Sequence, residues 1–290
     1  MALASSSMPV IRQVYNSCGI ASVLMVLKPD KNKELDAFLR NLEKKITKNL
    51  KLDPVRYDFL DRVQFAAAWL ILHAVFKEPA ILEMLAPSYP DIENFRPMLE
   101  SRLDEMVVYQ KAGNNARIEK DHARLIERGE ITQNVLVSYV QEQKTDAELR
   151  LLGSMFGLVF KAVPEADGGT PLGTVAQVDP RHPEEYMKKV GLLVRQLEAG
   201  AVFANYEYHW LPLREIGTRI GQFVKEEKQI ASASEISATP HYFKLNNPLS
   251  GTILSVTRLD ILAKYIFYLY DFQLSQQRRI LNLLKATLKL

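Results

Sequence analysis

A long apolar run begins directly after Cys18, the only cysteine in this chain of 290 residues. The run includes Ile20, Ala21 and residues 23–27, and it is apolar on nearly every side of a helical projection. A helix without a polar face has to be buried on all sides. The sequence therefore predicts a core helix whose first turn carries the cysteine sulfur.

Cys18 suits the role of a nucleophile. A thiolate becomes usable near neutral pH at the first turn of a helix, where unpaired N–H groups and the helix dipole stabilise negative charge. Its neighbours Asn16, Ser17 and Gly19 are residues that can start such a helix. A lone free cysteine can also serve as a small buried hydrophobe. The catalytic interpretation therefore requires a base and an orienting group elsewhere in the chain.

The composition narrows the classes of protein. With 47% hydrophobic residues the chain can bury a large core, as one domain or as two lobes. A single cysteine makes no intrachain disulfide, residues 1–9 lack the features of a signal peptide, and no segment approaches a membrane span of about 20 apolar residues. We therefore expect a cytoplasmic protein that does not bind membranes. Basic and acidic residues nearly balance, with a net charge of +3, which argues against nucleic acid as the main partner. The lysines in 28–51 fit a solvated helix face.

The apolar spacing predicts helices through much of the chain. The expected helices are 32–49, 54–76, 78–86, 91–110, 114–128, 130–143, 145–161 and 183–197. Glycine and proline between Pro164 and Pro183 indicate a long surface loop. Short β-branched or aromatic runs follow at 201–212, 221–230, 242–245 and 252–256, and they predict a small antiparallel sheet. Helical spacing from 258 to 290 predicts C-terminal helices, so the fold class is α+β.

A cysteine nucleophile needs an imidazole to take its proton. The chain has five histidines: His73, His122, His182, His209 and His241. The first three fit a core position, an exposed helix and a loop, whereas the last two lie in strand-like segments. One of these two is the expected base.

Asn247 is the expected orienting residue, at the end of the strand that begins near His241. Six residues of extended strand span about 20 Å, so His241 and Asn247 cannot pair unless the chain folds back. His209 lies on another predicted strand, and sheet pairing could bring it beside Asn247. We therefore favour His209 as the base and keep His241 as the alternative. Gln13 lies just before the cysteine and is the expected side-chain donor to an oxyanion, together with the Cys18 N–H.

These residues resemble the motifs of the papain-like cysteine peptidases, nearest to the bacteriocin-processing (double-glycine) peptidases and their relatives. The resemblance is carried by Gln13, by Asn16 to Gly19, by His209-Trp210 and by the turn 247–251. It implies Cys18 as nucleophile, His209 as general base and acid, Asn247 as orienting residue in place of the Asp of that branch, and Gln13 as oxyanion donor. The string from Asn16 to Gly19 also looks like the nucleophile motif of the ubiquitin C-terminal hydrolases, without a second motif around His209.

The resemblance implies a papain-like α+β domain over 1–290. Its parts would be a nucleophile helix in 1–29, a helical lobe in 30–163, a loop in 164–183, a helix and sheet lobe with the base in 184–256, and C-terminal helices in 257–290. The expected activity is hydrolysis of a peptide or isopeptide bond in a peptide or protein substrate, with neither a metal nor an organic cofactor. Acyl transfer or deamidation by the same triad, and a non-enzymatic helical interaction protein, are the alternatives.

Overall fold

The structure is a computed structural model that describes residues 3–4, 8–28, 32–88, 92–109, 115–160, 174–175, 183–207, 209–216, 243–256 and 265–290. The chain divides into two compact units, and neither is continuous in sequence. The first unit combines 1–12, 22–28 and 158–272, and the second combines 13–21, 29–157 and 273–290. Helix α1 (Cys18–Leu27) contributes residues to both. All 10 of its residues are buried, which confirms the predicted core helix.

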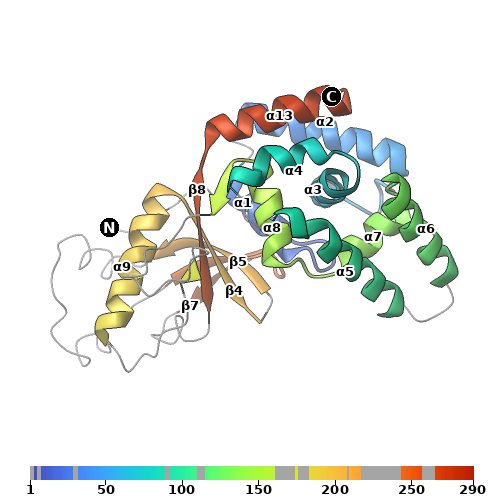
Figure 1. The fold of residues 1–290 in the computed structure, drawn as a ribbon. Coiled ribbons are helices and arrows are strands. Elements are labelled where there is room, and N and C mark those ends of the chain that lie inside the picture. Colours follow the sequence, from blue (N-terminus) through green and yellow to red (C-terminus); the bar gives the residue numbers. More distant parts are fainter. Residues whose placement is uncertain are drawn as a thin grey trace. The chain divides into compact units, whose positions relative to one another are not determined.

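The second unit is helical. Its elements are α2 (Lys33–Leu50), α3 (Phe59–Phe76), α4 (Pro79–Leu85), η2 (Ala86–Ser88), η3 (Ile92–Asn94), α5 (Phe95–Tyr109), α6 (Asn115–Arg128), α7 (Gln133–Gln141), α8 (Asp146–Met155) and α13 (Leu274–Leu288). Helix α13, from the C-terminus, lies beside α2 and α4 although they are far apart in sequence (Figure 1). The helices of 29–157 and the C-terminal helix therefore belong to one unit.

Helix α3 is the centre of this unit. Its apolar residues occur on all sides, and α2, α4, α7 and α8 pack around it. Asp58 and Asp61 form a capping box that fixes its first turn. The helix is long and apolar enough to span a membrane by length and composition, with 72% of that window buried inside the structure. Such burial is what a core helix requires.

The two largest errors in the predicted helix boundaries of this part are at 54 and at 161. The helix expected from 54 begins at Phe59, because residues 54–56 form a turn before the Asp58 cap. The helix expected to reach 161 ends at Met155, because Gly157 has a φ of 83° and the next residues enter a strand. That strand, β2 (Leu158–Phe160), pairs with β8 (Ile266–Phe272).

The first unit is built on an antiparallel sheet. Its other strands are β1 (Leu3–Ala4), β3 (Thr174–Val175), β4 (Ala201–Tyr206), β5 (His209–Ile216), β6 (Phe243–Asn247) and β7 (Thr252–Val256). The order is β2-β8-β4-β5-β6-β7, with β1 paired to β5 and β3 paired to β8. The small antiparallel sheet is confirmed, and with it the α+β class.

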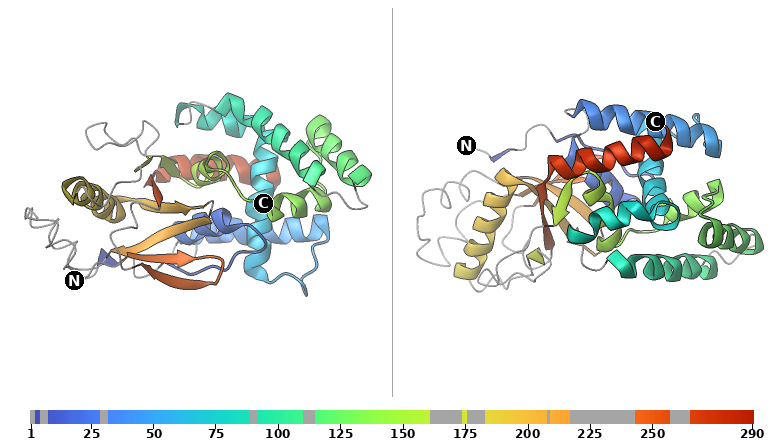
Figure 2. Two further views of the ribbon diagram at one scale, coloured as in Figure 1. Left: turned by 90° about the horizontal axis from the view of Figure 1, so that it is seen from below. Right: turned by 45° about the horizontal axis from the view of Figure 1, so that its top comes forward.

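Helix α9 (Pro183–Ala199) packs on one face of this sheet (Figure 2). Val190, Leu193 and Val194 of α9 share a core with apolar residues of the sheet, among them Leu211, Leu213, Phe243 and Leu245. None of these seven side chains is more than 2% exposed. This packing fixes β5 and β6 side by side.

Three strand predictions need correction. The run 201–212 is a hairpin of β4 and β5 and not one strand, because Glu207 adopts a φ of 48° that reverses the chain. The C-terminal segment is not wholly helical: β8 pairs with β4 on one side and with β2 and β3 on the other. The expected loop 164–183 contains β3, and its other residues before 183 lie outside the described part of the chain, as does the strand expected at 221–230.

Candidate active site

A histidine and an asparagine meet at adjacent ends of β5 and β6 in the first unit. His209 begins β5, Asn247 ends β6, and the two strands are antiparallel neighbours. His209 Nε2 lies 2.9 Å from Asn247 Oδ1, a hydrogen bond between side chains that are 38 residues apart in sequence. The two residues that the sequence singled out as base and orienting group therefore do contact each other. His241 lies outside the described residues.

The surroundings of Asn247 define the tautomer of the imidazole. Its Oδ1 also accepts a hydrogen bond from the backbone N–H of Leu249 at 3.0 Å. A backbone N–H can only donate, so the amide atom facing it is the oxygen. An oxygen can only accept, so His209 Nε2 carries the hydrogen. A neutral imidazole then has its lone pair on Nδ1, and Nδ1 is the nitrogen able to take a proton.

The neighbouring asparagine has a different function. Asn246 is completely buried, and its Nδ2 donates to the carbonyl of Pro9 at 2.8 Å. Arg214 on β5 donates to the carbonyl of Met8 at 2.7 Å. These contacts hold the N-terminal segment against β5 and β6. Of the two adjacent asparagines, Asn246 therefore anchors the chain and Asn247 holds the imidazole.

Cys18 is the first residue of α1 and belongs to the second unit. Its side chain is buried, at 2% exposure. A Cβ at the next residue, Gly19, would lie 2.6 Å from Cδ1 and 2.7 Å from Cδ2 of Leu149 on α8, so a larger residue would force the Leu149 side chain to shift. The start of α1 is therefore packed tightly against the start of α8.

A buried hydrogen-bond network holds the segment that leads into Cys18. Ser17 Oγ donates to the carbonyl of Val14 at 2.6 Å and contacts Gln64 Oε1 on α3 at 2.7 Å. The Val14 N–H points to the same two oxygens, 3.1 Å from Ser17 Oγ and 3.2 Å from Gln64 Oε1. Ser17 and Gln64 are both completely buried. The sequence alone did not identify Gln64, because its polarity within an apolar helix is the only feature that distinguishes it.

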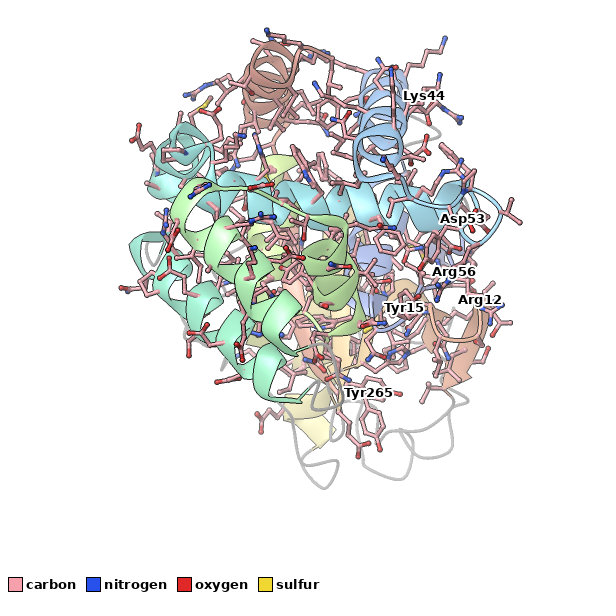
Figure 3. All side chains as sticks on the ribbon, turned by 90° about the vertical axis from the view of Figure 1, so that its right-hand side faces the viewer. Arg12, Tyr15, Lys44, Asp53, Arg56 and Tyr265 are labelled. Carbon is pink, nitrogen blue, oxygen red and sulfur yellow. The ribbon has the colours of Figure 1, made fainter. Side chains whose placement is uncertain are left out.

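Tyr15 gives this segment an unusual backbone. Its φ of 53° lies in the left-handed region that non-glycine residues rarely adopt. Its hydroxyl lies 2.9 Å from the hydroxyl of Tyr57 and accepts a hydrogen bond from Arg56 at 3.0 Å; Figure 3 shows Tyr15 and Arg56 next to each other. Backbone strain of this kind persists only where the surroundings hold it. The tyrosine and arginine contacts supply that restraint.

Gln13 begins the same segment. One N–H of its amide donates to the carbonyl of Tyr15 at 2.5 Å, while its Oε1 is buried without a hydrogen-bond partner in the described structure. A primary amide carries two N–H bonds, so this contact engages one of them. The second N–H is the group that the predicted oxyanion role requires.

The predicted residues thus occur in two sets. His209 and Asn247 are in the first unit, whereas Gln13 and Cys18 are in the second. No group of three His, Cys, Asp or Glu side chains that could hold a metal ion occurs among the described residues. Comparison of the chain with protein-family models, with curated proteins and with solved structures gives no match.

Proposed function

We propose that this protein is a papain-like cysteine peptidase that hydrolyses a peptide or isopeptide bond through Cys18, His209 and Asn247. The observation that carries the proposal is the imidazole held by Asn247, whose oxygen is fixed in turn by the Leu249 N–H. A hydrogen-bonded orienting group that leaves one ring nitrogen basic is what a general base needs.

In the proposed reaction, His209 Nδ1 takes the proton of the Cys18 thiol and the thiolate attacks the substrate carbonyl carbon. The developing oxyanion accepts hydrogen bonds from the Cys18 N–H and the Gln13 amide. The C–N bond then breaks, the imidazolium gives its proton to the leaving amine, and a thioester remains on Cys18. Water, deprotonated by the same imidazole, releases the acid and restores the thiol.

The start of β5 is also anchored within the first unit. Ser22 Oγ donates to the backbone carbonyl of Trp210 at 2.9 Å, and Trp210 follows His209 directly.

One observation favours a different function, that of a non-enzymatic interaction protein. Cys18 is only 2% exposed, and burial in apolar surroundings keeps a thiol protonated and unreactive. Alkylation by iodoacetamide at pH 6 separates the two. An activated thiolate reacts rapidly at this pH, whereas a packing thiol reacts slowly. Since Cys18 is the single cysteine, every modified molecule reports on this site.

The variants H209A and H241A form a matched pair for the same assay. The proposal expects H209A to slow alkylation at pH 6 and H241A to leave it unchanged. Slow alkylation of the wild-type protein, or equal rates for wild type and H209A, contradicts the proposal.

Hydrolysis is tested by incubating a peptide library with the protein and with C18S in water labelled with ¹⁸O. A peptidase places ¹⁸O in new C-terminal carboxylates only when Cys18 is present. Products that form only with an added amine indicate acyl transfer, and ¹⁸O in side-chain carboxylates without chain cleavage indicates deamidation.

A further inference from the structure

A buried lysine lies at the start of α1 within the second unit. Lys144, in the short connection between α7 and α8, is only 3% exposed. An ammonium group of this kind is costly to bury without compensating partners. The groups around Lys144 therefore have to compensate its charge.

Two contacts place the segment that carries Lys144 beside the segment that carries Cys18. Asn16, two residues before the cysteine, donates through Nδ2 to the carbonyl of Gln141 at 2.6 Å. Gly19, the residue after the cysteine, is in close contact with Leu149. The segment 141–149 therefore runs along the segment 16–19, and Lys144 and Cys18 are each a buried residue of one of these two neighbouring segments.

We propose that Lys144 is a positioning residue for the proposed nucleophile: its buried ammonium group stabilises the negative charge of the Cys18 thiolate. The inference rests on the proposed function for its catalytic meaning, and it adds a second source of activation besides the imidazole. The charge interaction itself is a property of the second unit alone.

Three other charged side chains surround Lys144: Glu148, Arg102 and Glu142. Glu148 on α8 is completely buried and is paired with Arg102 of α5. Tyr139 of α7 donates its hydroxyl to Glu148 at 2.6 Å. Two cations, Lys144 and the half-buried Arg102, thus accompany two carboxylates, Glu148 and the half-buried Glu142.

Lys144 is held in place and keeps its charge near neutral pH. Its Nζ donates to the carbonyls of Tyr139 and Glu142 and lies 4.1 Å from the centre of the Tyr139 ring. Burial lowers the pKa of Lys144 to about 8, against the opposing effect of Glu148, with smaller effects of Arg102, Glu142 and Cys18. The pKa remains above 7, so the ammonium form dominates at neutral pH. Because a charge interaction is mutual, a thiolate that favours the ammonium is favoured by it.

A structural role is the alternative, since Lys144 also satisfies two carbonyls at the end of α7. Thiolate absorbance at 240 nm separates the roles, because subtracting the C18S spectrum isolates the single thiol. This titration needs no reagent to reach the buried sulfur. The variants are K144M and K144R, and the control is K45M, which removes another lysine that donates to a backbone carbonyl, that of Leu288.

The inference expects K144M to raise the midpoint of the thiol titration by about one pH unit or more, the usual effect of one nearby charge. K144R should keep the midpoint within a few tenths of a unit, and K45M should leave it unchanged. A folded K144M with the wild-type midpoint overturns the inference.

A reciprocal measurement avoids any loss of folding in K144M. The NMR resonance of the Lys144 ε-methylene group is titrated in the wild type and in C18S. The lysine midpoint should be lower in C18S, because the thiolate that favours the ammonium is absent. Equal midpoints overturn the inference.

The inference and the proposed function fail separately. A shift in K144M without one in H209A, together with no ¹⁸O incorporation, retains the lysine–thiolate interaction and refutes the peptidase. A shift in H209A without one in K144M retains the proposed base and refutes the role of Lys144.

Discussion

Replacing Gln64 with methionine removes the amide that holds the segment before Cys18. Gln64 Oε1 accepts from the Val14 N–H at 3.2 Å, and Gln64 Nε2 donates to the carbonyl of Leu60 at 3.2 Å; the side chain has no solvent exposure. Methionine keeps a similar length and volume without an acceptor of comparable strength. Ser17 and Val14 retain their bonds to each other, so the change removes two hydrogen bonds of the Gln64 amide without leaving the Val14 N–H unpaired.

Each lost hydrogen bond costs about 1 kcal/mol, so Q64M should lower the free energy of unfolding by about 2 kcal/mol. For a domain of the size of the second unit this corresponds to a melting temperature about 4–8 °C lower. The start of α1 should also shift, and small displacements of a reacting group lower rates by about 10- to 100-fold. We therefore expect slower alkylation of Cys18 at pH 6 in addition to the lower melting temperature.

The matched control is Q277M, in the same unit. Gln277 is also buried, and it donates to the carbonyl of Phe156 at 2.9 Å and accepts from Asn32 at 3.0 Å. Its replacement removes two hydrogen bonds of the same kind, so the loss in melting temperature should be similar. Its effect on Cys18 alkylation should be small. Equal alkylation rates in Q64M and Q277M at matched stability would refute the argument that Gln64 positions the nucleophile.

Three further predictions concern Asn247, Gly19 and His73. N247A should lower kcat/KM about 100-fold by freeing the imidazole, whereas N247D, which keeps the acceptor oxygen, should retain most of the activity in a peptide-cleavage assay. G19A should lower the free energy of unfolding by about 1–3 kcal/mol, measured by urea denaturation, and L149A should relieve part of this cost in the double variant. Burial, with nearby Lys77 and Lys45, lowers the pKa of His73 to about 4, so the unfolded chain binds a proton there first as the pH falls from 6.5 to 4. The free energy of unfolding should therefore fall between pH 6.5 and pH 4, with up to about 3 kcal/mol of the loss due to His73. Melting temperatures measured across this pH range should fall less steeply in H73F than in the wild type. Equal pH dependence in the two proteins would contradict the lowered pKa of His73.

The helical part of the fold was predictable because its pattern is local. Helix α2 has a clear apolar stripe with polar residues opposite, and α8 begins with a capping box of Thr145 and Glu148 that is readable from the sequence. Strand β8 was not predictable in this way. Leu259, Leu262, Ile266 and Leu269 repeat at helical spacing, but pairing with strands on both sides outweighs that local pattern.

The candidate site likewise has a part that was predictable from the sequence and a part that was not. The pairing of His209 with Asn247 was within reach of sequence reasoning, because strand geometry excluded the nearer histidine on an extended chain. The contacts of the cysteine segment were not, since Gln64 and the segment that carries Lys144 are brought there by helix packing across long sequence distances. No local pattern distinguishes a buried lysine from a solvated one before the packing is known.

The polar groups around the start of α1 argue against a purely structural cysteine. After Cys18 the helix is apolar apart from Ser22, as a packing element should be. At its first turn, however, Ser17, Gln64 and Lys144 are all at most 3% exposed, so this one end of the helix concentrates costly buried polar groups. Each buried polar group needs hydrogen-bond partners of its own, a requirement that an apolar residue at the same place would not impose. A sequence that retains them around its single thiol departs from the best packing at one place, and such departures are expected at functional sites.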